Sequence, residues 1–379
     1  MKLTVATLLT AAGWKTAQTL IVEHGMIQAV RPATAAEQDA MLPGSLIPGY
    51  IDTQVNGGGG VLLNQQPSYE GICQMAHAHL QFGSTGMLPT VITDHADIMI
   101  QAADAVAEAI SQNHPTVLGI HFEGPFLSRA KKGVHDQDLI RAPTDADIAT
   151  LTRRDIGKVL ITLAPEQTDS GLIRELVAEG VRVALGHSNA TAAQVEVALA
   201  AGVTGFTHLY NAMSPLTSRE PGVTGAALAD EHSYCGLIVD HHHLHPISAK
   251  IAIKAKGAQR IMLVTDAMAH VGTTLQRLSF FNTEILRQGD KLTTPEGVLA
   301  GSCLDMHRAV LHTHRDLHIS LPEAVQMASA TPAAFLGLSD TMGCIAVGQV
   351  ANLLRLDDQL RLCDIWLRGE HIKPTQLTC

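Results

Sequence analysis

Apolar segments of strand length alternate with helical segments from about residue 46 onward, and this alternation constrains the fold more than any other feature. The candidate strands are residues 45–55, 85–92, 116–124, 158–166, 182–188, 204–210, 234–240 and 260–267. Most are continuous apolar runs, which are typical of parallel strands buried on both faces. The helical segments between them include 69–83, 96–112, 171–180 and 191–202, of which the last two end on glycines. Eight such units favour closure into a (β/α)₈ TIM barrel, with a doubly wound open sheet as the alternative.

The two ends of the chain have a different character. Residues 19–32 contain two strand-like runs that turn at Gly25, and the last part of the chain returns to short β-rich segments. With 379 residues, the chain is long enough for a large barrel and a small appendage. We therefore predict a barrel over residues 46–345 and a small β-sandwich domain formed by residues 1–45 and 346–379.

Composition narrows the class of protein. Hydrophobic residues make up 46% of the chain and charged residues 16%, as in globular enzymes, and the net charge of −10 disfavours nucleic-acid binding. No apolar run has the length of a transmembrane helix, and the six cysteines lack metal-binding or disulfide-framework spacing. We therefore expect a cytoplasmic protein with free thiols and no membrane partner. Residues 1–14 raise the alternative of a signal peptide, but threonines interrupt the apolar run, and we expect the segment to stay as β structure.

Polar side chains end several of the predicted strands. Glu123 follows the third strand, His187 the fifth, His208 the sixth and Asp266 the eighth. The carboxyl ends of barrel strands meet at one face, where such folds carry their active sites. One carboxylate, two imidazoles and a water make an open zinc site of the catalytic kind, so we predict Glu123, His187 and His208 as metal ligands. Each residue taken singly is more often a packing, surface or turn residue, and only their shared placement supports the site.

The stretch DTQVNGGGG, residues 52–60, ends the first predicted barrel strand. Residues two apart on a strand share a face, so Gln54 and Asn56 point the same way, and the glycines after them allow close approach to the backbone. Two amide side chains are therefore expected in the same pocket as the carboxylates and histidines.

Several strings in this chain resemble those of the N-acetylglucosamine-6-phosphate deacetylase family of the amidohydrolase superfamily. They are PGYIDTQVNG, HFEGPFL, KKGVH, TLAPE, GHSNAT, THLYNAM, REPG, VTDA and LAGS, in the family's order and almost from end to end. The resemblance implies a barrel with a small β domain, a homodimer, and metal-dependent hydrolysis of a linear amide. Its substrate would be the acetamide of N-acetyl-D-glucosamine 6-phosphate, which gives D-glucosamine 6-phosphate and acetate in amino-sugar catabolism.

Many amidohydrolases carry His-x-His where this chain has Gln54 and Asn56. Neutral amides are weak ligands compared with imidazole, so we expect a vestigial first metal site and one divalent metal per subunit. The amides would bind water or line the pocket, or alternatively would only hold the glycine loop. Zinc fits the remaining ligands, and iron, cobalt and manganese are alternatives.

The chemistry of amide hydrolysis assigns further roles. A divalent metal supplies an activated water and polarises the carbonyl, so the protein must move a proton to the leaving amine. Asp266 is placed to accept and deliver that proton. The resemblance implies that His135 is a second catalytic residue that contacts the substrate, polarising the carbonyl or holding a sugar hydroxyl.

The resemblance also implies the substrate contacts, with Arg219 and His243 on the phosphate and Arg219 reaching the neighbouring subunit's site. The complete expected set is Val134, His135, Asn211, Ala212, Arg219, His243, Leu299, Ala300 and Gly301. The plain alternatives are a surface ion pair for Arg219 and an ordinary turn for residues 299–301. For Lys131 and Lys132 we favour a solvated basic pair.

Two departures from the family pattern and three competing functions stay open. DHHHLH, residues 240–245, offers four histidines for one contact, and His270 stands where the family usually has a small residue, so that it could alter the pocket mouth or the metal.

Competing functions are deacetylation of N-acetylgalactosamine 6-phosphate, a non-catalytic sugar-phosphate-binding barrel, and a cyclic-amide hydrolase. Asp266 argues against mere binding, and Gln54 and Asn56 argue against a two-metal cyclic-amide hydrolase.

Overall fold

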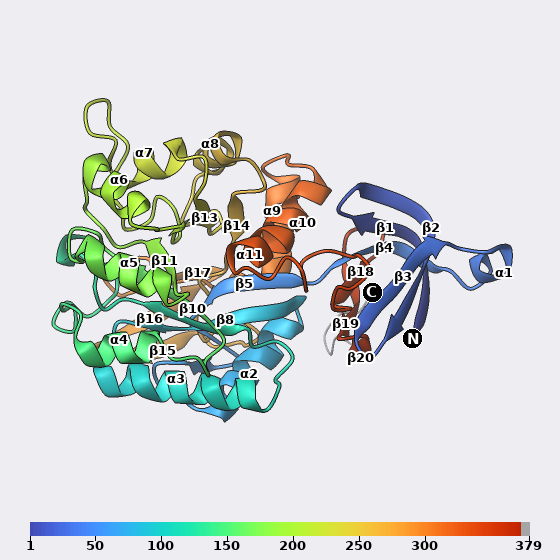
Figure 1. Cartoon of the computed structure of the whole chain (residues 1–379), viewed down its shortest axis with the longest axis horizontal. Helices are drawn as coiled ribbons and strands as arrows, with labels where there is room; N and C mark the ends of the chain where they lie inside the picture. The colour runs from blue at the N-terminus through green and yellow to red at the C-terminus, as the bar shows by residue number, and fades with distance from the viewer. Residues whose placement is uncertain (373–379) are drawn as a thin grey trace.

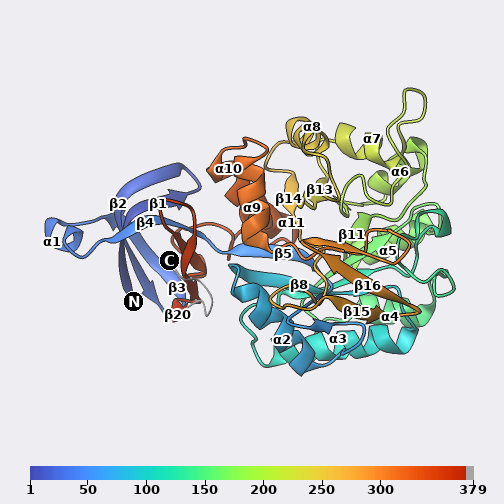
Figure 2. The same cartoon turned by 180° about the vertical axis from the view of Figure 1, so that it is seen from behind.

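The computed structural model describes residues 1–372, which form a barrel and a smaller sheet at its side (Figures 1 and 2). The small domain predicted to extend to residue 379 therefore ends in residues that lie outside the described ones, and Cys379 is among them. In the part of the chain that the structure describes, no helix is long and apolar enough to cross a membrane.

Eight parallel strands form the barrel in the order in which they occur in the chain, each hydrogen-bonded to the next. They are β5 (Tyr50–Val55), β8 (Ser84–Ile92), β9 (Gly119–Glu123), β10 (Lys158–Leu163), β11 (Arg182–Leu185), β12 (Gly205–Phe206), β13 (Tyr234–Leu237) and β14 (Ile261–Leu263). The first and last strands approach at their carboxyl ends, where Val55 bridges Ala267 and the Asp266 amide donates to the Gln54 carbonyl at 3.0 Å. The prediction of a nearly closed barrel is confirmed, and the open sheet is excluded.

Helices cover the outside of the barrel because each has one apolar face. Their bounds are α2 (Tyr69–Leu80), α3 (Ala96–Ser111), α4 (Asp145–Leu151), α5 (Ser170–Ala178), α6 (Ala192–Ala200), α7 (Gly222–Ala229), α8 (Pro246–Lys256), α9 (Met306–Arg315), α10 (Leu321–Ala328) and α11 (Ala330–Phe335), with a 3₁₀ turn η1 (Arg129–Lys131). Side-chain caps start many of them; Thr191, for example, accepts from the Gln194 amide at the start of α6. The chain leaves α5 and α6 through Gly180 and Gly202, at φ +86° and +110°.

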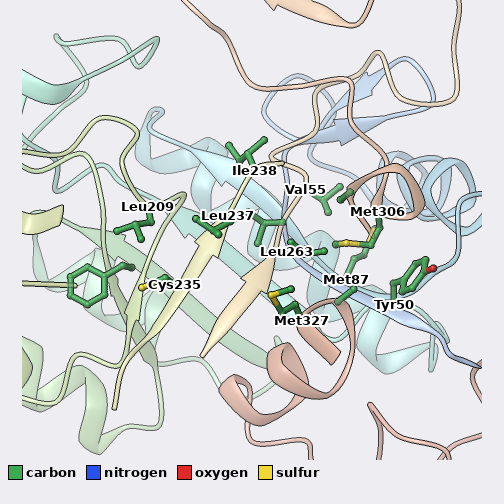
Figure 3. Packing of buried hydrophobic residues seen from close by; sticks show 14 of the residues in the cluster. Tyr50, Val55, Met87, Leu209, Cys235, Leu237, Ile238, Leu263, Met306 and Met327 are labelled. Carbon is green, nitrogen blue, oxygen red and sulfur yellow. The ribbon is translucent and has the colours of Figure 1, made fainter. Parts of the chain in front are cut away.

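The main apolar core lies between the strands and the surrounding helices. Figure 3 shows Leu263 of β14, Met87 of β8 and Met327 of α10 within one packed cluster. Toward the barrel mouth a polar layer crosses the interior: His121 Nε2 lies 2.8 Å from Thr162 Oγ1, which lies 2.6 Å from Thr207 Oγ1. These buried groups satisfy one another directly beneath the ends of the strands.

Both ends of the chain build the small sheet, in the order β20-β19-β18-β4-β1-β2-β3. The strands are β1 (Lys2–Thr10), β2 (Gly13–Glu23), β3 (Met26–Pro32), β4 (Leu42–Pro48), β18 (Leu353–Leu356), β19 (Leu362–Leu367) and β20 (Glu370–Ile372), with the short helix α1 (Ala35–Gln38). The sheet curls so that Leu20 and Trp366, from its two halves, share one core. The predicted turn at Gly25 is present, and the boundary placed at residues 45–46 falls inside β4.

Two small sheets were not predicted. A hairpin of β6 (Gly57–Gly58) and β7 (Val61–Leu62) forms from the glycine stretch, and β15 (Arg277–Phe280), β16 (Thr283–Gln288) and β17 (Lys291–Thr293) form a three-stranded insert after β14. Phe280 of the insert packs in one cluster with Leu62 and Met268. The insert therefore belongs to the same end of the barrel as the predicted site.

Candidate active site

The carboxyl ends of the barrel strands surround a pocket of about 380 Å³. Its lining includes most of the residues that the sequence brought forward: Asn56, Glu123, Val134, His135, His187, His208, Asn211, Ala212, His243, Asp266, Leu299 and Gly301. These residues come from six different strand ends and from loops as far along the chain as residue 301. Because the barrel alone brings them together, the pocket is the candidate active site.

Three predicted metal ligands meet at one point in this pocket. Glu123 Oε1 lies 3.2 Å from His187 Nε2 and 2.9 Å from His208 Nε2, and the two imidazole nitrogens lie 3.1 Å apart. All three side chains are buried. His187 Nδ1 donates to the Lys131 carbonyl at 2.8 Å, which leaves Nε2 as the lone-pair nitrogen. Lone pairs that converge in this way need a cation or a proton between them, so the donor set fits a divalent metal.

The backbone at these positions is held in an unusual conformation. His187, His208 and Asp266 have φ values of +47°, +33° and +51°, in the region that residues other than glycine rarely adopt. Each such residue costs about 1–3 kcal/mol, and the surrounding barrel must hold it. All three residues follow strand ends, and this backbone conformation directs each side chain toward the barrel axis.

Charge interactions stabilise this cluster of one carboxylate and two imidazoles. Burial alone would raise the pKa of Glu123, but the neighbouring imidazoles of His187 and His208 hold it well below its usual range. Burial would lower the pKa of His208, and the hydrogen bond to Glu123 raises it above its ordinary value. Glu123 is therefore a buried anion that requires positive charge at the two imidazoles or at a cation between them.

A second set of three donors overlaps the first. One donor atom each of Glu123, His135 and His187 lies within 4.8 Å of the others. His135 Nδ1, however, lies 2.8 Å from the hydroxyl of Thr93, and the distances that join Glu123, His187 and His208 are all 3.2 Å or less. The geometry therefore favours His208 over His135 as the third ligand.

The amides of Gln54 and Asn56 hold the two carboxylates. Gln54 Nε2 donates to Glu123 Oε2 at 3.1 Å and to Asp266 Oδ1 at 3.2 Å, and Asn56 Nδ2 donates to Asp266 Oδ1 at 2.6 Å. The sequence predicted amides that bind water or line the pocket, and the structure places them as direct donors. Both side chains therefore present N–H donors to the site, whereas metal ligands would have to present lone pairs.

Asp266 is a pocket carboxyl group without a predicted role as a metal ligand, and its pKa is strongly perturbed. Burial and the charge of Glu123 together raise its pKa to about 6, against the opposing effect of the hydrogen bond from Asn56. A carboxyl group poised near neutrality can accept a proton and return it. His135 stands near by, and burial, together with the charge of His187, lowers its pKa well below the ordinary value.

Of the four histidines in DHHHLH, His243 is the one that lines the pocket. Its Nδ1 lies 2.7 Å from Asp240 Oδ2. The others have different surroundings, since His241 pairs with Asp316, His242 pairs with Asp290, and His245 caps α8. The loop geometry therefore selects His243, the histidine that the resemblance implied.

Four predicted or suspected residues do not line the pocket. Gln54, which we expected there, instead lines a small separate cavity with His121 and Thr207. Arg219 is exposed on the loop before α7, and Ala300 is buried between Leu299 and Gly301, which do line it. His270 is buried with no hydrogen-bond partner for either ring nitrogen among the described residues, and it lines a separate cavity with Arg287 and Arg308. It therefore alters neither the pocket mouth nor the ligand set.

Sequence reasoning missed several lining residues. Phe280 enters from the unpredicted insert, and Ile92, Met268 and Val298 add apolar wall. Lys131, which we took for a solvated residue, also lines the pocket, and its carbonyl fixes His187. Its position three residues before the expected substrate contact Val134 was the available signal, but a main-chain role leaves no mark in the side chain.

Comparisons with known proteins agree with this geometry. The model of the amidohydrolase family matches residues 45–374. An N-acetylgalactosamine-6-phosphate deacetylase of Shewanella sp. (strain ANA-3) is 48% identical over 92% of this chain and 90% of that protein. The crystal structure of N-acetylglucosamine-6-phosphate deacetylase from Pasteurella multocida superposes with a TM-score of 0.93 at 32% identity, covering 98% of this chain and 100% of that one.

A further structure is a mutant N-acetyl-D-glucosamine-6-phosphate deacetylase from Mycobacterium smegmatis in complex with N-acetyl-D-glucosamine 6-phosphate. It has a TM-score of 0.88 and 29% identity, and the match covers 98% of each chain. Coverage of this extent leaves no large part of the fold unmatched. The chain belongs to the amidohydrolase family and, within it, to the N-acetylhexosamine-6-phosphate deacetylases that its motifs resemble.

Proposed function

We propose that the protein hydrolyses the acetamide of N-acetyl-D-glucosamine 6-phosphate to D-glucosamine 6-phosphate and acetate, in amino-sugar catabolism. The observation that carries the proposal is the convergence of Glu123, His187 and His208 beside Asp266 in one pocket of about 380 Å³. The names of the relatives supply the substrate class. Binding alone would not require a buried carboxyl group of raised pKa beside a metal-binding cluster.

Glu123, His187 and His208 are proposed to hold one divalent cation, with zinc first and iron, cobalt or manganese as alternatives. When bound, such a cation lowers the pKa of a water molecule and polarises the acetyl carbonyl. The amides of Gln54 and Asn56 support a single site, because they present N–H donors to Glu123 and Asp266 where a second cation would need lone pairs.

Asp266 is proposed to move the proton. In its ionised form it accepts a proton from the attacking water, and it then delivers that proton to the amide nitrogen, so that the C–N bond breaks with a neutral amine leaving. Gln54 and Asn56 orient Asp266 Oδ1 and favour its charged form. Oδ2 is left as the atom that exchanges the proton.

His135 is proposed to donate to the acetyl oxygen. Its lowered pKa keeps the imidazole neutral. The Thr93 hydroxyl has two acceptors within reach, His135 Nδ1 at 2.8 Å and the Glu123 carbonyl at 3.3 Å. The shorter distance favours donation to Nδ1, which puts the single ring proton on Nε2. A neutral donor aimed at the developing oxyanion adds to the stabilisation of the transition state.

The sugar phosphate is proposed to lie against Asn211, Ala212 and His243, with Val134 and the 299–301 loop beside the sugar. Arg219 is exposed and absent from the pocket of its own chain, which supports a role in the site of a partner subunit in a homodimer. Cys73, Cys235, Cys303 and Cys344 are free thiols, which supports a reducing, cytoplasmic setting.

The galacto epimer, N-acetylgalactosamine 6-phosphate, is a second candidate substrate. The 48% identity to the Shewanella enzyme favours it, since the Pasteurella enzyme that is named for the gluco epimer is 32% identical. The two sugars differ only in the orientation of one hydroxyl group. The reaction and the proposed roles of the residues are the same for both.

Acetate release tests the proposal directly. Protein of measured metal content is assayed on both sugar phosphates and on both dephosphorylated sugars. We expect release from a phosphorylated sugar and little from its dephosphorylated form. Failure to release acetate from either sugar phosphate by metal-loaded protein would refute the function, and equal rates without the phosphate would refute the phosphate contacts.

Mixed dimers test the role of Arg219. Arg219→Ala should raise KM for the sugar phosphate, while the control Arg277→Ala, at another exposed arginine, should not. If Arg219 serves the partner's site, mixing inactive Asp266→Asn chains with Arg219→Ala chains restores about a quarter of the wild-type sites after random reassortment into symmetric dimers. Activity no higher than that of the Arg219→Ala protein in the mixture would show that Arg219 serves its own chain or none.

A further inference from the structure

We infer that His241, His312 and Asp316 form a second metal site on the surface, separate from the candidate active site. His241 lies in the loop after β13, His312 is on α9, and Asp316 is the residue at which α9 ends. One donor atom of each lies within 4.8 Å of the other two. None of the three lines the catalytic pocket, so the inference is independent of the proposed function.

His312 is oriented as a metal-binding histidine. Its Nδ1 donates to the Val239 carbonyl at 2.7 Å, and a neutral imidazole has a single N–H, so Nε2 carries the lone pair. A carbonyl that fixes the tautomer and the ring direction is the usual support of a ligating histidine. Asp316 follows four residues later, so both side chains lie on one face of the helix end.

His241 is brought to this face by its loop. Its φ is +66°, a conformation that few residues other than glycine adopt, and it turns the side chain away from the pocket that His243 enters. His241 Nε2 lies 2.9 Å from Asp316 Oδ2, and the rings of His241 and His312 have their centroids 4.6 Å apart. Two imidazoles and a carboxylate therefore face one small volume.

This donor set suits zinc and, equally, copper(II), nickel(II) or cobalt(II). The side chains of His241 and Asp316 are 34% and 46% exposed, so water can complete the coordination without burial of charge. A bound cation would join the 240–245 loop to α9. Because His243 of that loop lines the catalytic pocket, the cation would brace one wall of it.

Metal counting on the full-length protein, with its catalytic metal already loaded and measured, tests the inference. During equilibrium dialysis against increasing Zn²⁺, the wild type should bind one more cation per chain. His312→Gln and Asp316→Asn should each weaken that additional binding by about tenfold or more. His314→Gln is the matched control, because His314 is on the same helix, with Nδ1 2.8 Å from the Ile319 carbonyl, but lies outside the cluster.

Electron paramagnetic resonance of Cu²⁺ at the additional site identifies its ligands. We expect coupling to two histidine nitrogens in the wild type and in His314→Gln, and to one in His312→Gln. The inference is wrong if the wild type takes up no additional cation. It is also wrong if both ligand variants bind the additional cation as tightly as the wild type does.

Discussion

Removing the amide of Asn56 should shift the pH dependence of the reaction. Asn56 Nδ2 donates to Asp266 Oδ1 at 2.6 Å, and this bond favours the ionised carboxylate. Asn56 Oδ1 has no hydrogen-bond partner among the described residues, so Asn56→Ala removes only the bond to Asp266 and a long contact of Nδ2 with Met268 Sδ at 3.8 Å. The variant therefore isolates a single contact to the proposed base.

The size of the shift follows from the strength of that bond. A hydrogen bond to a charged group contributes about 1.5–3 kcal/mol, and 1.36 kcal/mol corresponds to one pKa unit. Loss of the bond raises the pKa of Asp266 by about one to two units from a value that burial already places at about 6. Since only the ionised form accepts a proton, the acidic limb of kcat/KM should move to higher pH by the same amount.

The assay is acetate release across the pH range, with the metal content measured for each protein. Activity of Asn56→Ala should fall about 10- to 100-fold on the acidic limb and recover at high pH. Asn64→Ala is the control, because Asn64 Nδ2 donates to the carboxylate of Asp94 at 2.8 Å outside the pocket. An acidic limb that stays in place in metal-replete Asn56→Ala would refute the reasoning, as would an equal shift in Asn64→Ala.

Three further outcomes are expected. Asp266→Asn should keep its metal and lose about 10²–10⁴-fold in kcat, as judged by metal analysis and acetate release. Glu123→Gln should lower the metal content measured after dialysis, because it removes the charge that two imidazoles share; an unchanged content would exclude Glu123 as a ligand. Asp52 tests stability: burial raises its pKa to about 7, so the folded protein retains a proton that the unfolded chain has released above about pH 4. The free energy of unfolding should therefore fall as pH rises from about 4 to 7. Asp52→Asn should not show this fall, so the Tm of the variant minus that of the wild type should be larger at pH 8 than at pH 5.

The barrel was predictable because its strands are buried on both faces. β8 is buried at all nine positions, and its sequence, STGMLPTVI, contains no charged residue and only small polar ones. The three-stranded insert was not predictable for the opposite reason. β15 has only Phe280 fully buried, and its alternation of polar and apolar residues, RLSF, covers just four positions. Phe280 is thus a pocket residue on an element that leaves little trace in the sequence.

The candidate ligands were predictable from their shared place after strands, but their geometry was not. The position after a strand predicts that His187 and His208 reach the barrel mouth. It does not predict that both residues adopt a positive φ. The Lys131 carbonyl that orients His187 belongs to the main chain, and any residue at position 131 could supply it. Which histidine of residues 241–245 enters the pocket depends on the path of the loop, and the local sequence does not determine that path.

The replacement of imidazole by amide at position 54 has a physical consequence for the whole site. Glu123 and Asp266 are both buried, and the charge of Glu123 raises the pKa of Asp266. Gln54 lies between them, and its one –NH₂ group donates to both carboxylates, at 3.1 and 3.2 Å. A neutral imidazole there has one N–H and one lone pair, so it could donate to only one of them and would offer a ligand to a cation. The amide instead donates to two adjacent carboxylates without a second cation. This arrangement suits the roles proposed for them, Glu123 as a metal ligand and Asp266 as the group that moves the proton.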